Sequence, residues 1–187
     1  MKQKNRASRK ARVAVFGTLR VLTFSALLCA MSIVLGKYLA IRGGEILRFS
    51  FENLPILLAG ILFGPVVGAA VGAVADLLGC LLVGYAINPL VTAGAVLIGA
   101  SAGLLWRLSQ RCPLGPRVLL SVGTAHLLGS VLLKTLGLAA FYAMPPGLLL
   151  LWRLLNYAIV GTLEILLTYA ILKNQALRRW IRKETER

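Results

Sequence analysis

The sequence predicts an all-α integral membrane protein, a bundle of six transmembrane helices with both the N and C termini in the cytoplasm. Hydrophobic residues make up 58% of the 187 residues, and the mean hydropathy is +0.82, which is too apolar for an ordinary soluble domain. Long apolar stretches, most of them near the ~20 residues needed to cross the hydrocarbon core, alternate with short connections. Finally, Lys and Arg gather in three clusters at residues 2–20, 107–117 and 173–187, and cytoplasmic loops are enriched in these residues.

The first span is expected at residues 19–39, followed on the outer side by a polar segment at residues 42–53. The next apolar stretch, residues 54–83, is long enough for one long helix or two short ones. Gly64-Pro65 lies near its middle, and a proline there suits the first turn of a new helix. The remaining spans are expected at residues 89–105, 118–141 and 148–172, the last two joined by a short turn at residues 144–147.

The charge distribution decides between one helix and two at residues 54–83. One helix would place the second and third basic clusters outside the cell, against the positive-inside tendency, whereas two helices place all three inside. We therefore expect two helices, and the first could begin as early as Phe49. The chain then divides into a basic cytoplasmic arm at residues 1–18, a six-helix domain at residues 19–172 and a basic cytoplasmic tail at residues 173–187.

Several classes of function have little support. The net charge of +15 would suggest nucleic acid in a soluble protein, but here the lipid bilayer and membrane orientation account for the basic clusters, so no nucleic-acid partner is expected. The chain has one histidine and no motif of a hydrolase, a metal site or a nucleotide-binding loop. We therefore expect no enzyme activity, no metal and no cofactor in this chain.

Five ionisable side chains fall within the expected spans: Asp76, His126, Lys134, Arg153 and Glu164. Such residues are costly in lipid and usually face a bundle interior or a cavity. Helix rise places Asp76 and His126 near the middle of the membrane, with Lys134 and Arg153 further out. This gradient would suit an anionic ligand that has a hydrogen-bond-donating end.

Each of these residues also has a simpler interpretation. Arg153 could extend to the outer interface, His126 could be a satisfied core histidine, and Lys134 and Glu164 could be paired structurally. Asp76, central and surrounded by glycines, is the hardest to explain without a ligand. A proton relay through Asp76, His126 and Glu164 is a further possibility.

Three segments carry a family resemblance: residues 48–55 (RFSFENLP), 58–68 (LAGILFGPVVG) and 75–79 (ADLLG). They resemble the substrate-binding S components of energy-coupling factor (ECF) vitamin importers, specifically the folate branch. The similarity continues through residues 84–89 and Thr92 and, less specifically, through residues 151–153 and 156–157. It covers most of the chain beyond the basic arm.

The resemblance implies a multi-pass protein of a prokaryotic plasma membrane, with a fold that agrees with the charge argument. It also implies that the chain binds folate or a related vitamin outside the cell and works with a membrane-embedded T component. Two cytoplasmic ABC-type ATPases would consume the ATP. In the family, a small-xxx-small motif of the first helix docks against the T component, and Ala26 and Ala30 stand at the corresponding place.

A folate pose can be drawn from these residues. Asp76 would accept hydrogen bonds from the pterin ring, while Arg153, Lys134 or Arg48 would pair with the glutamate carboxylates. Aromatic side chains would cover the ring. The remaining residues of the predicted site are Tyr85, Tyr157, Phe51, His126, Asn156 and Asn88. The alternatives are another vitamin or a purine-like ligand on the same scaffold, a solitary proton-coupled carrier, or a purely structural membrane subunit.

Overall fold

The computed structural model describes residues 19–43, 47–142 and 146–174, so the predicted basic arm at residues 1–18 and nearly all of the predicted tail lie outside the described residues. Helix α2 (Leu19–Ile33) continues as the π-helical turn η1 (Val34–Tyr38), and α3 (Asn53–Phe63) precedes α4 (Pro65–Val83) and α5 (Pro89–Leu108). Helix α6 (Leu114–Ala125), the π-helical segment η2 (His126–Leu133) and α7 (Lys134–Tyr142) form one continuous rod. Helix α8 (Pro146–Lys173) comes last.

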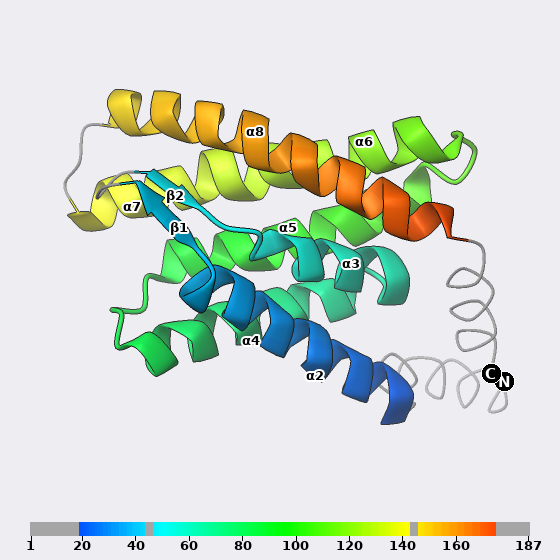
Figure 1. The fold of residues 1–187 in the computed structure, drawn as a ribbon, viewed down its shortest axis with the longest axis horizontal. Helices are drawn as coiled ribbons and strands as arrows, with labels where there is room; N and C mark the ends of the chain where they lie inside the picture. The colour runs from blue at the N-terminus through cyan, green and yellow to red at the C-terminus, as the bar shows by residue number, and fades with distance from the viewer. Residues whose placement is uncertain (1–18, 44–46, 143–145, 175–187) are drawn as a thin grey trace, which may run out of the picture.

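The helices alternate in direction along one long axis (Figure 1). The blue start of α2, the ends of α3 and α5, the start of α6 and the red end of α8 all lie at one end of the bundle. The chain places Arg20, Arg107, Arg111, Arg117 and Lys173 at or beside these helix ends. The structure therefore collects basic residues from all three predicted clusters at a single end of the molecule.

Within the described residues, five helical segments are long and apolar enough to cross a membrane: Leu19–Tyr38, Pro65–Val83, Pro89–Leu108, Leu114–Phe141 and Leu149–Lys173. The prediction of an α-helical membrane protein is thus confirmed at this level. The sixth predicted helix, α3, has 11 residues and is about 16 Å long at 1.5 Å per residue, roughly half of the hydrocarbon core. It begins at Asn53, not near Phe49.

The predicted break at Gly64-Pro65 is confirmed. Gly64 ends α3 at φ 102°, a backbone conformation that favours glycine, and its N–H donates to the Gly60 carbonyl at 2.9 Å. Pro65 then opens α4, where the missing N–H costs nothing. Two three-residue strands were not predicted: β1 (Ile41–Gly43) and β2 (Leu47–Phe49) pair antiparallel within the polar segment before α3.

Small residues let α3, α4 and α5 pack with their backbones in contact. A Cβ atom at Gly99 of α5 would lie 2.1 Å from the Gly68 carbonyl oxygen of α4, and one at Gly68 would lie 2.6 Å from the Gly60 Cα of α3. A Cβ atom at Gly72 would lie 2.3 Å from the Ala95 carbonyl oxygen. In lipid, such close packing is a main source of helix association. These three helices form a rigid wall behind the site described next.

Candidate functional site

Four ionisable side chains from different elements line one cavity: Lys37 of η1, Glu52 just before α3, Asp76 of α4 and Lys134 of α7. The rest of the lining is formed by Ser32, Ile33, Ile56, Ala75 and Ala95. The volume of this cavity is about 10 Å³, which leaves room for about one water molecule. The cavity is therefore polar, charged and narrow.

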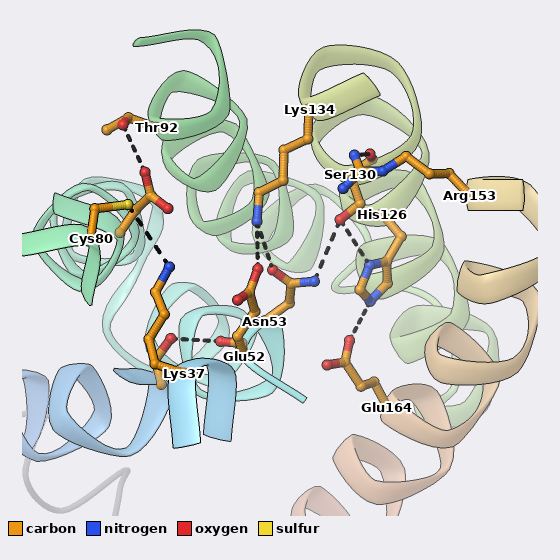
Figure 2. A network of polar contacts seen from close by, with 12 residues as sticks. Lys37, Glu52, Asn53, Cys80, Thr92, His126, Ser130, Lys134, Arg153 and Glu164 are labelled. Carbon is orange, nitrogen blue, oxygen red and sulfur yellow. Dashed lines mark hydrogen bonds and ion pairs between the residues drawn. The ribbon is translucent and has the colours of Figure 1, made fainter. Parts of the chain in front are cut away.

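Lys134 is the most buried charge of the cavity, with 3% of its side chain exposed. Its ammonium group lies 3.0 Å from Glu52 Oε1 and donates to Asn53 Oδ1 at 3.3 Å (Figure 2). Glu52 reaches the site because its own backbone carbonyl accepts a hydrogen bond of 2.6 Å from the Ser32 hydroxyl of α2. A buried ammonium requires such partners, since an unpaired charge would shed its proton or unfold the site.

Asp76 belongs to the part of the cavity lining that α4 contributes, and it is held in place from α5. The Thr92 hydroxyl donates to Asp76 Oδ2 at 2.7 Å. Thr92 is itself held one turn into α5 by the N-cap residue Asn88, whose Oδ1 accepts from the Leu90 and Val91 amides and whose Nδ2 donates to the Gly137 carbonyl at 2.8 Å. Asn88 therefore orients the start of α5 against α7 and does not line the cavity.

Lys37 and Glu52 were not among the residues predicted from the sequence. Lys37 Nζ lies 3.8 Å from the Cys80 sulfur and 5.6 Å from the centroid of the Tyr85 ring. A signal was present, because Lys37 is the one charged residue between Arg20 and the end of the first apolar span. Glu52 lies in a connection, where a charged residue carries no comparable signal.

Several predicted residues lie together outside the cavity. His126 Nε2 is 2.5 Å from Glu164 Oε2, an ion-pair distance at angles outside the hydrogen-bond range. The Tyr157 ring lies 5.4 Å from the His126 ring, and Arg153 donates to the Ser130 carbonyl at 2.9 Å. Figure 2 shows Arg153 and His126 grouped around Ser130, away from Lys37 and Thr92. The expectation of Arg153, Tyr157 and His126 as cavity residues is not met in this conformation.

The other predicted residues also lie elsewhere. Tyr85 is exposed beside Lys37, and Phe51 and Asn156 are half-buried outside the cavity lining. The backbone of Arg48 lies in β2, but its side chain is outside the described part of the chain. Of the ten predicted binding residues, Asp76 and Lys134 line the cavity.

Ala26 and Ala30 line a second hollow, an apolar groove of about 330 Å³ between α2 and α4 on the outside of the bundle. The other lining residues are Leu22, Ser25, Cys29, Ile33, Ala70, Val71, Val74 and Leu78. Small residues on both helices leave this surface hollow, which would let another helix approach closely.

Comparisons with known proteins agree with this architecture. The family model described as ECF transporter, substrate-specific component, matches residues 20–175. The folate transporter FolT of Clostridium novyi (strain NT) is 26% identical over 160 residues, which cover 82% of this chain and 88% of that protein.

Two solved structures share the fold. A crystal structure of FolT bound with folic acid superposes with a TM-score of 0.65 at 26% identity, covering 81% of this chain and 92% of that one. An S-component for biotin from an ECF-type ABC transporter gives 0.64 at 18% identity, covering 83% and 92%. The second likeness concerns the fold alone. Together with the family match, these findings make the protein a transporter subunit, not an enzyme, and the chain belongs to the substrate-specific components of ECF transporters.

Proposed function

We propose that this chain binds folate, or a closely related vitamin, in the cavity between Asp76 and Lys134 and delivers it for ATP-driven import. The observation that carries the proposal is that one aspartate and two lysines, from three different helical segments, line the same cavity. Folate has a pterin ring with hydrogen-bond donors at one end and two carboxylates at the other. The likeness to a transporter named for folate supports this ligand.

The chemistry of the walls sets the direction of binding. Asp76 Oδ1 and Oδ2 can accept from the donor edge of the pterin ring, in the manner of Thr92, which already donates to Oδ2. Lys37 and Lys134 supply ammonium groups for the carboxylates, and charge-assisted hydrogen bonds are about twice as strong as neutral ones. The arginine assigned to the glutamate tail from the sequence, Arg153, is engaged with Ser130.

The ligand itself is tested by thermal unfolding of the purified protein in detergent with a panel of vitamins. Folate at about 100 times its Kd should stabilise the folded state by about 2.7 kcal/mol, whereas biotin and thiamine should leave the melting temperature unchanged. Asp76→Asn should abolish most of the folate shift, because the amide presents N–H groups where the pterin presents its own. A larger shift with another vitamin, or an undiminished shift in Asp76→Asn, would refute the proposal. Leu77→Asn, on the neighbouring exposed position, controls for the added amide.

We further propose that the six helices are embedded in the plasma membrane of a prokaryote, with both termini cytoplasmic. Helix α3 itself extends through only part of the bilayer. The basic end of the bundle supports this orientation. At that end the Arg117 guanidinium lies 3.7 Å from the centroid of the Trp106 ring, and tryptophan is enriched at membrane–water interfaces.

Cys112 reports this orientation directly, since it is half-buried in the connection between α5 and α6 while Cys29 and Cys80 are buried. In intact cells a membrane-permeant maleimide should label Cys112, and an impermeant one should not. Labelling by the impermeant reagent that disappears in Cys112→Ser would reverse the assigned orientation.

The partners implied by the family are a membrane-embedded T component and two cytoplasmic ATPases. We assign the T-component contact to the apolar groove that contains Ala26 and Ala30. Replacing both alanines with leucine fills the groove and should prevent co-purification of the T component, while folate still stabilises the isolated chain. Ala158→Leu, at an exposed alanine of α8, should co-purify normally. Normal co-purification of the double variant would place the contact elsewhere.

A further inference from the structure

A series of polar contacts connects Glu164 of α8 to the cavity, and its first link is the close approach of Glu164 and His126, which lies outside hydrogen-bond angles. His126 Nε2 lies 2.5 Å from Glu164, and His126 Nδ1 lies 3.3 Å from Ser130 Oγ. Asn53 Nδ2 contacts the same Ser130 Oγ at 3.5 Å, and Asn53 Oδ1 accepts from Lys134. Figure 2 shows the series running from Glu164 through His126 and Ser130 to Asn53 and Lys134. Its first member is fully buried and remote from the cavity, and its last member lines it.

The direction of each hydrogen bond follows from the ammonium group. Lys134 has donors only, so it must face Asn53 Oδ1, and this turns the two N–H donors of Asn53 Nδ2 toward Ser130. Ser130 is fully buried, and within the described residues its hydroxyl contacts only Asn53 and His126. Because buried hydroxyls are rarely left unpaired, the Ser130 proton must point at His126 Nδ1.

The histidine tautomer is then determined. Nδ1 has to accept, so the ring carries its proton on Nε2, which faces the Glu164 carboxylate. The opposite tautomer would point the Nε2 lone pair at a carboxylate oxygen 2.5 Å away, and because both side chains are buried, the repulsion would be poorly screened.

We propose that Glu164 and His126 are positioning residues for the substrate site. Glu164 keeps the proton of His126 on Nε2, so that Nδ1 accepts from the Ser130 hydroxyl. Ser130 in turn accepts from Asn53 Nδ2, which leaves Asn53 Oδ1 to accept from Lys134 and orients the Lys134 ammonium toward the cavity. Neither residue touches the ligand. Partner residues of this kind orient the groups that do the binding, as outer hydrogen-bond partners do around metal ligands. The role in ligand affinity rests on the proposed function, whereas the tautomer does not.

The tautomer can be measured without any ligand, because His126 is the single histidine of the chain. Protein labelled with ¹⁵N-histidine should give one imidazole pair in a two-bond ¹H–¹⁵N spectrum. We expect the pattern of a neutral ring protonated at Nε2 in the wild type and in Glu164→Gln, whose amide oxygen can still accept. A proton on Nδ1, or on both nitrogens, would overturn the proposal even if the protein binds folate.

Affinity measurements test the positioning role. Glu164→Leu should weaken folate binding about tenfold, within the range of coupling energies in one hydrogen-bond network, and Glu164→Gln should stay within about twofold of the wild type. In a Ser130→Ala background the series is already cut, so Glu164→Leu should cause no further loss. A tenfold loss in both backgrounds would mean a merely structural effect and would overturn the role.

Two further results complete the design. Thr162→Val, two residues away on the exposed side of α8, should bind folate like the wild type. If Glu164→Leu does not fold, two measurements still test the proposal: the histidine spectrum of the wild type and the folate affinity of Glu164→Gln. A tenfold loss of affinity in Glu164→Gln, together with the expected tautomer, would contradict the positioning role. Absence of folate binding by the wild type, with the expected tautomer, would refute the proposed ligand alone.

Discussion

Gly99→Ala should destabilise the protein more than any other single-methyl change in the bundle core. The added Cβ would lie 2.1 Å from the Gly68 carbonyl oxygen and 2.3 Å from the Gly68 carbonyl carbon, both backbone atoms that cannot rotate away. Helices α4 and α5 would have to separate, and overpacking of this kind costs about 3 kcal/mol. The measurement is thermal unfolding in detergent, read as the fraction of protein that remains monodisperse after heating.

Gly123→Ala provides the matched control for this experiment. Gly123 is also a glycine inside a membrane-spanning helix, but a Cβ there would meet nothing within 4 Å among the described residues. Since alanine is the better helix former by up to about 1 kcal/mol, this variant should be as stable as the wild type or slightly more so. Equal melting temperatures for the two variants would show that α4 and α5 are not in backbone contact.

Lys134→Met should have the largest effect on the cavity itself. Methionine has a similar length but leaves Glu52 facing Asp76 without the ammonium that pairs with it, and breaking a buried pair costs about 3 kcal/mol or more. We expect a lower melting temperature and a loss of folate binding of at least about a hundredfold. Isothermal titration of folate and thermal unfolding measure the two effects separately.

Two companion variants separate charge balance from ligand contact. Adding Glu52→Gln to Lys134→Met removes the carboxylate charge as well and should restore most of the stability but none of the folate affinity. Lys37→Met should scarcely change stability, because Lys37 is half-buried and contacts a thiol and an aromatic ring, yet it should weaken folate binding. Restored affinity in the double variant would mean that Lys134 serves the fold alone.

The helical architecture could be predicted from the sequence because its signals are local. Apolar length sets the spans, and Gly64-Pro65 marks the break between α3 and α4 through a positive φ and a missing N–H. The antiparallel pairing of β1 and β2 could not be predicted, since hydropathy alone leaves this part of the chain as a polar connection.

The candidate site could be predicted only in part. Asp76 and Lys134 were identified because a charge within an apolar span is rare and informative. Pairing between helices is not a local property of the sequence. The sequence therefore carried no signal that Arg153 would donate to the Ser130 carbonyl or that His126 would lie beside Glu164. The π-helical segment η2 adds to this difficulty, since its wider turn changes which side chains of the helix share a face.

The narrowness of the cavity has an energetic consequence. A molecule as large as folate fills a pocket of about 300 Å³ or more, so the walls at Lys37, Glu52 and Lys134 must part before it can enter. The apparent dissociation constant of folate then includes the free energy needed to open the cavity. It equals the dissociation constant of the open form divided by the fraction of molecules that are open. A substitution that loosens these walls can therefore tighten ligand binding while it lowers the melting temperature.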